Sequence, residues 1–510
     1  MFKLTKTTGF RGLPCRTLQN LQIAREYASK TRHRIKRSAQ LSPHVAKATT
    51  NETKKIRGNV PGRITANLPS GRFSALKGVE SDERIKFRSL LEKVDSFDAL
   101  KIHSEIRHGI LNGALDHVEN KKPTSIQTLG VKIIRGRHTA DRKFDLHSYV
   151  LAAETGSGKT LAYLAPLLSE LKDEENAPHW PLIKESAVVR SVILVPTLEL
   201  INQVANTISH ISQKLDQPIE YFACTQELSS KQIRAKITKR VDVLICTPDK
   251  MLRLFEEYSP KRFLETCKFM VVDEADSLMD ESFAPSTQKA IQLVYNLQNL
   301  VFCSATIPRR FDRTMRSLYP NAFRIVSPSV HKMPSHVDFR VVEVFRAPYN
   351  DNKFLALQQA LYAIHHDGTE PGLTKRVVVF VNNKNEVEKM ATNLNAKGYP
   401  AVGVSGQVSS EERRGMIEDF VTSPKPAPES GVRVKALITT DLMARGIDMQ
   451  NVKNVILYDL PYSSVDLLHR SGRTGRIGRR GRVFLFVNRK ESEGWVKGLE
   501  KVIKKGLALA

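Results

Sequence analysis

Two short motifs in this chain hold side chains suited to binding a nucleoside triphosphate and a divalent metal. Residues 153–160 read Ala-Glu-Thr-Gly-Ser-Gly-Lys-Thr, and residues 273–276 read Asp-Glu-Ala-Asp. Glycines let a backbone wrap closely around phosphate oxygens, and the amides at the start of a following helix supply positive potential. Each motif follows an apolar run that is typical of a buried strand. The two motifs are therefore predicted to meet at one edge of one sheet.

In the first motif, both side chains and backbone groups are predicted to contact the nucleotide. Lys159 is predicted to reach the β- and γ-phosphates, and the Thr160 hydroxyl is predicted to ligate Mg²⁺. Five residues that precede Lys159 in the chain are also predicted to contact the nucleotide: Ala153, Thr155, Gly156, Ser157 and Gly158. A motif of this kind alone indicates a nucleotide-binding protein and nothing more specific.

Two acids at the end of the apolar run Phe269–Val272 supply the chemistry of water activation. Asp273 can hold Mg²⁺ through water, and Glu274 can orient or deprotonate the attacking water. The alternative is a pair of solvated acids at the end of a strand. It is disfavoured because this strand follows the phosphate-binding loop in the order expected of an α/β protein. Together the two motifs predict a nucleoside triphosphatase.

Two series of apolar runs are available to position these motifs. Continuous β-branched runs suit parallel strands that are covered on both faces. The first series comprises Tyr149–Ala153, Ser191–Val195, Val243–Cys246, Phe269–Val272 and Val301–Cys303. The second comprises Val377–Val381, Ala401–Val404, Lys435–Thr439, Asn454–Tyr458 and Val483–Val487. We therefore predict two α/β domains, each a parallel sheet flanked by helices.

Composition suggests where these domains begin and end. Residues 327–340 are rich in Ser and Pro and are predicted to join the two domains. The first domain is then expected to span 95–328 and the second 329–510. Residues 1–50 are predicted to be a targeting segment, and residues 51–94 a flexible extension.

The charge of the chain points to a polyanionic partner. The net charge is +26, and residues 1–50 contain eleven Lys and Arg side chains and one acid, Glu26. Without that stretch, 68 basic and 52 acidic residues remain, a surplus of +16. A basic targeting segment alone therefore does not explain the charge, and nucleic acid is the predicted partner.

Residues 1–50 have the composition of a mitochondrial transit peptide. They are rich in Arg, Ser and Thr, and they lack the long apolar core of a secretory signal. A disordered basic arm that binds RNA is the alternative. The five cysteines lack the spacing of a zinc site, which fits a reducing compartment such as the mitochondrial matrix. No run approaches the ~20 apolar residues that span a bilayer, so no membrane insertion is expected.

With the motifs that follow, the chain resembles the DEAD-box family of ATP-dependent RNA helicases over roughly residues 97–487. The resemblance implies two tandem RecA-like domains and the cofactors ATP and Mg²⁺. Residues 122–127 are similar to the family's adenine-reading segment, which implies that Gln127 hydrogen-bonds the adenine edge and that Phe97 stacks on it. Residues 304–306, Ser-Ala-Thr, are similar to its coupling motif. The coupling residues so implied are Asp276, Ser304, Thr306 and His469.

The second domain carries the complementary motifs. Residues 469–476 read His-Arg-Ser-Gly-Arg-Thr-Gly-Arg and match the family's arginine motif. This resemblance implies that Arg473 and Arg476 face the γ-phosphate when the domains close, where fixed cations stabilise the transferring phosphoryl group. Asp448 ends another matching segment and is implied to lie near the ribose. Because half of the site lies on each domain, hydrolysis is predicted to require domain closure.

The family contacts RNA mainly through the sugar-phosphate backbone, and such contacts do not read sequence. The implied backbone contacts of this chain are Pro196, Thr197, Thr247, Pro248, Arg413 and Thr439. The chain departs from the family here, since Leu198 replaces an Arg, Asp249 replaces a Gly and Lys250 replaces an Arg. Losing one Arg–phosphate contact weakens binding by ~1–3 kcal/mol. The first domain is therefore expected to bind RNA less tightly.

These departures and the predicted transit peptide are similar to the fungal mitochondrial DEAD-box subgroup. That resemblance implies a monomer acting on mitochondrial ribosomal RNA, with ribosomal proteins or assembly intermediates, during large-subunit assembly. The first hypothesis is an RNA-dependent ATPase that remodels short duplexes or RNA–protein contacts. The alternative is an ATP-locked RNA clamp or assembly scaffold with little unwinding. Retention of Lys159, Glu274, Arg473 and Arg476 favours the enzyme.

Overall fold

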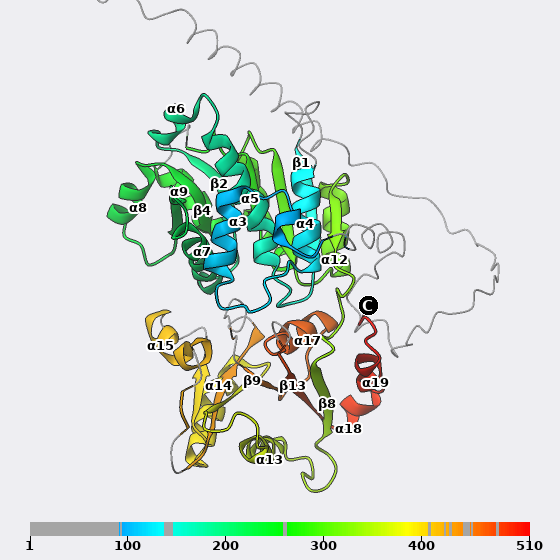
Figure 1. The fold of residues 1–510 in the computed structure, drawn as a ribbon. Helices are drawn as coiled ribbons and strands as arrows, with labels where there is room; N and C mark the ends of the chain where they lie inside the picture. The colour runs from blue at the N-terminus through cyan, green and yellow to red at the C-terminus, as the bar shows by residue number, and fades with distance from the viewer. Residues whose placement is uncertain are drawn as a thin grey trace, which may run out of the picture. The chain divides into compact units, whose positions relative to one another are not determined.

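The computed structural model contains two α/β domains, each built around one parallel sheet (Figure 1). The elements given below lie within one compact unit, Ala66–Ala510. The structure describes residues 91, 94–136, 146–258, 263–405, 410–422, 425–427, 431–441, 449, 452–475 and 479–509.

The first sheet has seven parallel strands in the order β3-β4-β2-β5-β6-β1-β7. In chain order they are β1 His147–Ala152, β2 Val189–Leu194, β3 Tyr221–Cys224, β4 Val241–Cys246, β5 Phe269–Val272, β6 Asn299–Ser304 and β7 Phe323–Val326. Strands β2, β4, β5 and β6 are buried along their whole length. Helices cover both faces of the sheet, so these strands need no polar side.

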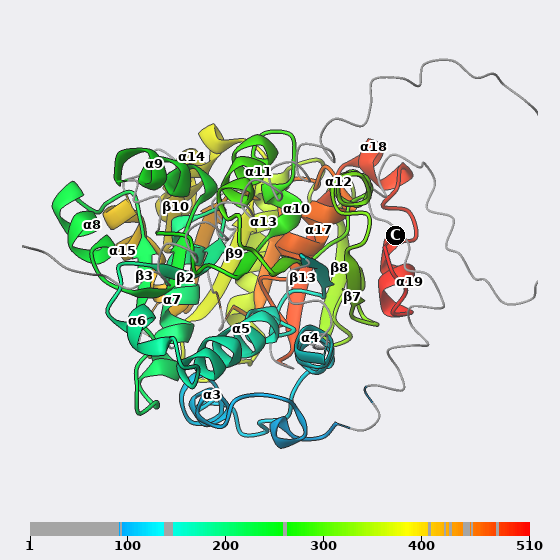
Figure 2. The same cartoon turned by 90° about the horizontal axis from the view of Figure 1, so that it is seen from above.

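Two hydrophobic clusters fill the space between the first sheet and its helices. One face is covered by α3, α4, α5 and α7, and the other by α8, α9, α11 and α12 (Figure 2). The helices of this domain are η1 Phe97–Ala99, α3 Ser104–Gly109, η2 Ile110–Ala114, α4 Ser125–Gly136, α5 Lys159–Glu175, α6 Trp180–Lys184, α7 Leu198–Ser212, α8 Ser230–Ile237, α9 Pro248–Tyr258, α10 Ala275–Leu278, α11 Ala284–Leu293 and α12 Arg309–Leu318.

The second sheet has six parallel strands in the order β10-β11-β9-β12-β13-β8. They are β8 Val337–Glu343, β9 Lys375–Phe380, β10 Ala401–Val404, β11 Val434–Thr439, β12 Asn454–Leu457 and β13 Gly481–Val487. Residues of α15, α17 and α19 fill one face, and residues of α13 and α14 fill the other. The helices are α13 Lys353–His366, α14 Lys384–Ala396, α15 Ser410–Val421, α17 Ser464–Ser471, α18 Arg489–Glu493 and α19 Leu499–Lys504.

The ten strands expected from apolar runs are all present, with ends that differ by at most two residues. Three further strands were not predicted, namely β3, β7 and β8. The linker predicted at 327–340 is too long, because residues 337–340 already belong to β8. Cys246 and Cys303 are buried, and their thiols pack in the core of the first domain.

Some predicted segments lie outside the part of the chain that the structure describes. These are the targeting segment at 1–50 and all of the extension at 51–94 except Leu91 and Val94. Among the described residues, no helix combines the length and apolar character needed to cross a bilayer.

Candidate active site

The phosphate-binding loop follows β1 and leads into α5, which begins at Lys159. Gly158 has a left-handed φ of 81°, and a Cβ there would lie 2.3 Å from the Gln127 side chain. Only glycine therefore fits this turn without displacing a neighbour. The Lys159 ammonium donates to the backbone carbonyls of Ala153 at 3.0 Å and Glu154 at 3.2 Å. The lysine is thus folded over the loop, where phosphate oxygens can take the place of these carbonyls.

The predicted adenine-reading segment is tied to this loop by two hydrogen bonds and is braced by a third within the segment. The Thr124 amide donates to Gln127 Oε1 at 2.9 Å, and Gln127 Nε2 donates to the Gly158 carbonyl at 3.2 Å. The Thr124 hydroxyl donates to the Ser157 carbonyl at 2.8 Å. Both polar groups of the Gln127 side chain therefore contact protein, and its contact with adenine stays a prediction.

Phe97 lies in η1, and its side chain is 2% exposed within the hydrophobic cluster under α4 and α5. A ring must offer an open face in order to stack on a base. The stacking of Phe97 on adenine requires the ring to be uncovered first. It therefore stays a prediction that this geometry does not support.

The two acids of residues 273 and 274 stand where β5 ends. Asp273 is 6% exposed, and its Oδ2 accepts a 2.8 Å hydrogen bond from the Tyr163 hydroxyl. Burial raises the pKa of Asp273 to about 6, and the Glu274 charge adds to this rise. The Tyr163 hydrogen bond and the Lys159 ammonium oppose it. The carboxyl group is therefore poised to ionise when a cation arrives.

Tyr163 is a site residue that the sequence analysis missed. It is fully buried, and burial followed by the Asp273 charge raises its pKa well above the usual value, against a hydrogen bond with Thr160. Tyr163 thus lies between the two oxygen ligands predicted for Mg²⁺, Thr160 and Asp273. Hydroxyl and carboxylate oxygens are ligands that Mg²⁺ accepts, so the donor set fits this ion. The spacing of four residues from Lys159 on one helix was the available signal.

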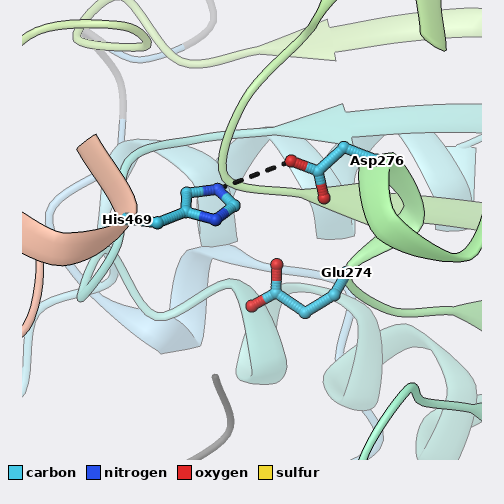
Figure 3. Close-up of side chains that lie close together, drawn as sticks. All are labelled: Glu274, Asp276 and His469. Carbon is cyan, nitrogen blue, oxygen red and sulfur yellow. Dashed lines mark ion pairs between the residues drawn. The ribbon is translucent and has the colours of Figure 1, made fainter. Parts of the chain in front are cut away.

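Glu274 has φ 48° and ψ 49°, a left-handed backbone that is costly for a residue with a side chain. Such strain is stored at ~1–3 kcal/mol and is concentrated at functional sites. The turn sends the Glu274 side chain toward Asp276 and His469, as Figure 3 shows. Ligand atoms of these three residues all lie within 4.8 Å of one another.

The predicted coupling residues meet at Asp276. Its Oδ2 accepts a 2.5 Å hydrogen bond from the Thr306 hydroxyl and lies 3.5 Å from His469 Nε2 (Figure 3). The Thr306 amide in turn donates to the Ser304 hydroxyl at 3.2 Å. One carboxylate of α10 is therefore shared by the segment after β6 and by α17 of the second domain.

The arginine motif is anchored by a buried arginine that was not singled out from the sequence. Arg470 makes two hydrogen bonds to Asp441, at 2.6 and 2.7 Å, and a third to Asn382 Oδ1 at 2.7 Å. A bidentate pair of this kind fixes direction as well as distance. Arg473 is also buried, and its Nε donates to the His469 carbonyl at 3.2 Å.

Two of the predicted ligands from the second domain, Arg476 and Asp448, lie outside the residues that the structure describes. Their roles at the γ-phosphate and the ribose are untested and stay predictions.

The residues predicted to contact RNA on the first domain follow two adjacent strands. Pro196 and Thr197 come after β2, and Thr247 and Pro248 come after β4, which pairs with β2. The hydroxyl of Thr197 accepts from the Leu200 amide at 3.3 Å and caps α7. These residues therefore follow neighbouring strands at the carboxyl edge of the sheet.

On the second domain the two predicted RNA contacts differ in exposure. Thr439 is buried at the end of β11, and its hydroxyl donates to the Thr440 carbonyl at 3.3 Å. Arg413 of α15 is partly exposed and pairs with Glu199 of α7 at 3.0 Å. The ion pair thus directs Arg413 toward α7, the helix that begins at Leu198.

Comparison with known proteins identifies the class. The DEAD/DEAH box helicase model matches residues 124–314, and the helicase conserved C-terminal domain model matches residues 352–478. The chain belongs to the DEAD-box family of ATP-dependent RNA helicases, as its motifs predicted.

Within that family the chain is similar to proteins named "ATP-dependent RNA helicase MRH4, mitochondrial". The protein of Vanderwaltozyma polyspora is 38% identical over 490 residues, covering 86% of this chain and 89% of that protein. The protein of Saccharomyces cerevisiae strain S288c is 35% identical over 539 residues, covering 94% and 95%.

Solved structures confirm the predicted fold of two RecA-like domains. S. cerevisiae Dbp5 bound to RNA and ADP BeF3 matches with a TM-score of 0.62 and 23% identity, over 80% of this chain and 93% of that chain. The DEAD-box helicase Mss116 bound to ssRNA and UDP-BeF matches with a TM-score of 0.63 and 23% identity, over 83% and 79%.

Proposed function

We propose that this protein is an RNA-stimulated ATPase that hydrolyses ATP to ADP and phosphate when RNA closes its two domains. The observation that carries the proposal is the shared carboxylate of Asp276. Its Oδ2 accepts a hydrogen bond from the Thr306 hydroxyl of the first domain and lies 3.5 Å from Nε2 of His469 in the second domain. Asp276 is two residues from Glu274, so the placement of the water-activating acid depends on both domains.

The positions of Lys159, Asp273 and Glu274 support the following hydrolytic step. Glu274 takes a proton from water, the water oxygen attacks the γ-phosphorus, and the bond to the bridging oxygen of ADP breaks. Lys159 holds the β- and γ-phosphates, and Arg473 and Arg476 stabilise the charge on the transferred group. Thr160 and Asp273 would hold Mg²⁺, which supplies further positive charge beside the phosphates.

We place RNA along the carboxyl edges of both sheets. Contacts to its backbone come from Pro196, Thr197, Thr247, Pro248, Arg413 and Thr439. Such contacts orient a single strand without reading its sequence, so the product of closure is a locally opened short duplex or a displaced RNA–protein contact. The side chain of Thr439 is buried, so it must become accessible before Thr439 can contact the RNA backbone.

We infer mitochondrial ribosomal RNA as the substrate, in the matrix, during assembly of the large subunit and with its ribosomal proteins as partners. The similar curated proteins are named mitochondrial, and residues 1–50 have transit-peptide composition. We place the domains at 95–328 and 329–510 after an extension at 51–94. The working species is a monomer.

The test uses the full-length protein with Glu274→Gln, which stalls the cycle after closure. Crosslinking this variant in mitochondria and sequencing the attached RNA should recover large-subunit ribosomal RNA above the level seen with the wild type. Recovery of other RNA alone would contradict the substrate. Displacement of a short duplex by the wild-type protein, measured in parallel, separates the helicase from a clamp that binds RNA without opening it.

A further inference from the structure

The segment between the two sheets contacts catalytic motifs of both domains. This segment, here called the linker, comprises residues 327–336, between the end of β7 and the start of β8. Because the chain must pass through it, any contact that it makes with a motif connects that motif to the other domain. Three such contacts are present, one to each of the phosphate-binding loop, the coupling motif and the arginine motif.

The first contact joins the start of the linker to the phosphate-binding loop. The Ser327 amide donates to the Ala152 carbonyl at 2.8 Å, which extends the pairing of β7 with β1. The Ser329 hydroxyl then donates to Glu154 Oε1 at 2.7 Å. Glu154 is the residue whose backbone carbonyl accepts from Lys159. The first residues of the linker are therefore held to the first domain by hydrogen bonds.

The second contact is made by His331, whose side chain is 1% exposed. Its Nε2 accepts a 2.9 Å hydrogen bond from the Ile307 amide, directly after the coupling residue Thr306. The accepting nitrogen must carry no proton, so the ring is neutral with its hydrogen on Nδ1. His331 also has a left-handed φ of 64°. A strained residue in this position indicates that the ring is held there by its surroundings.

The carbonyl of His331 has a partner at the other end of the chain. It accepts a 2.9 Å hydrogen bond from the amide of Leu509, whose side chain is buried among residues of the second domain. The C-terminal residues thus hold His331 from the side of the second domain while Ile307 holds it from the first. His331 is contacted by both domains at once.

The third contact is made by His336 with the arginine motif. Its Nε2 donates to the Gly475 carbonyl at 2.7 Å, since a carbonyl can only accept. Gly475 lies between Arg473 and Arg476 and has a left-handed φ of 67°. A Cβ on Gly475 would lie 2.4 Å from Val337 Cγ2 of β8 and 3.5 Å from the His336 ring, so the arginine loop packs closely where the linker meets β8.

Close packing leaves little room for the linker to move alone. A cavity of about 10 Å³ lies among the phosphate-binding loop, the coupling motif, the linker and α17. This volume is at the lower limit for one water molecule. A shift of the linker is therefore transmitted to its neighbours, as in any close-packed interior.

We propose that His331 and His336 are positioning residues that couple ATP hydrolysis to domain closure, His331 through the segment after Thr306 and His336 through the loop of Arg473. This inference rests on the proposed RNA-stimulated ATPase and adds a route by which closure reaches both halves of the site. Neither histidine contacts the reacting atoms. They act on the rate at which the closed site forms and leave the affinity for ATP unchanged.

The test compares His331→Leu with His331→Gln in the full-length protein. Both substitutions place a similar side chain on the same left-handed backbone, but only Gln can accept from the Ile307 amide. We expect Leu to lower the RNA-saturated kcat about tenfold, with the KM for ATP changed less than about twofold, and Gln to restore most of the loss. Ser335→Ala is the matched control, because Ser335 is an exposed residue of the same linker.

A second pair of variants, His336→Leu and His336→Gln, tests the proposed role of His336 at the loop of Arg473. Gln can donate to the Gly475 carbonyl and should again retain more activity than Leu. The double Leu variant should lose less than the product of the two single effects, because both act on one closure step. Thermal melting is measured for every variant to separate loss of coupling from loss of folding.

Three results would overturn the inference. One is an RNA-saturated kcat equal to the wild type in both Leu variants. Another is a loss confined to the KM for ATP. The third is equal loss in the Leu and Gln variants, because the hydrogen bond would then be irrelevant. A wild-type protein whose ATPase ignores RNA would instead refute the proposed function.

Discussion

Two groups of residues in the first domain differ in how completely hydrogen bonds hold their side chains. We call residues 153–160 and 273–276 the nucleotide edge, and residues 196–197 and 247–248, which are predicted to contact RNA, the RNA edge. At the nucleotide edge, Lys159, Asp273 and Asp276 each hydrogen-bond within the site. At the RNA edge, the hydroxyls of Thr197 and Thr247 cap the helices that follow them. Leu198 directly follows the first of these caps and begins α7.

In this domain, the residues predicted to carry out hydrolysis and those predicted to contact RNA are therefore held by separate sets of hydrogen bonds. The nucleotide site is an organised network in which one substitution disturbs several partners, so large effects are expected there. The residues predicted to contact RNA are half-buried or buried and follow separate strands, so each is expected to contribute a small, additive amount. Substitutions on the two edges test this contrast.

The largest effect is expected from Lys159→Ala. No other cation of the described loop replaces the ammonium beside Ala153 and Glu154, so phosphate release should fall by more than about 1,000-fold. Lys184→Ala removes an exposed lysine of the same domain and should be neutral. Retained turnover in the Lys159 variant would reject the assignment of the phosphate-binding loop.

Glu274→Gln should lower hydrolysis by about 10²–10⁴-fold, because an amide cannot take the proton from water. ATP and RNA should still bind, so the complex should persist when excess competitor RNA is added. Glu281→Gln, an exposed change shortly downstream, is the control. Rapid release of RNA from the Glu274 variant in saturating ATP would contradict the coupling of hydrolysis to opening.

Tyr163→Phe should shift the acid limb of the pH–activity profile to higher pH. Burial raises the pKa of Asp273 to about 6, and the Tyr163 hydrogen bond lowers it. Asp273 therefore becomes protonated as the pH falls through about 6. Without the Tyr163 hydroxyl, its pKa is higher and protonation begins at a higher pH. Activity should drop several-fold near pH 6.5 and little at pH 8. Tyr295→Phe is the control, and an unshifted profile would remove Asp273 from the limiting ionisation.

The same raised pKa has a consequence for stability. Folding favours the protonated form of Asp273, since its pKa in the folded protein lies above the usual 3.8. The contribution of this group to the free energy of unfolding therefore decreases as pH rises from about 4 to about 6. Asp273→Asn should remove this dependence, which urea titrations at several pH values would measure.

The smallest effect is expected at the RNA edge, from Leu198→Arg. One added phosphate contact should tighten RNA binding by ~1 kcal/mol, about fivefold, and steepen the salt dependence by about one counterion. Leu182→Arg adds the same charge on α6, where Leu182 is 75% exposed away from the motifs. Equal gains in both variants would show a general effect of charge and would remove Leu198 from the RNA path.

The sequence predicted all the interior strands and one edge strand, β10, but missed the other three edge strands. Strands β3, β7 and β8 were missed, and each lies at the edge of its sheet. Their residues are only half-buried, with alternation in β3 and exposed positions in β8. A continuous apolar run arises where both faces and both neighbours are covered, so this signal fades at an edge.

The candidate site was predicted motif by motif, but its supporting residues were not. Lys159, Glu274 and Asp276 stand in recognisable patterns, whereas Tyr163 and Arg470 gain their roles only from partners far along the chain. Such partners are set by packing across the sheet, which one sequence does not reveal. For the same reason, the burial of Phe97 was not foreseen.

The linker illustrates the same limit. Its Ser and Pro content predicted a junction, but composition could not tell that His331 and His336 each contact a catalytic motif. A histidine in a linker has no spacing rule to make it conspicuous. Its role follows from the three-dimensional contacts alone.

The measurement that tests the account most directly is the single-turnover rate of ATP hydrolysis by the intact protein with and without single-stranded RNA. A site shared between two domains requires RNA to assemble it, so saturating RNA should raise the rate by at least about tenfold. The Arg473→Gln variant should lose this stimulation while still binding ATP. A rate that is the same with and without RNA would contradict the account, because each domain would then not depend on the other.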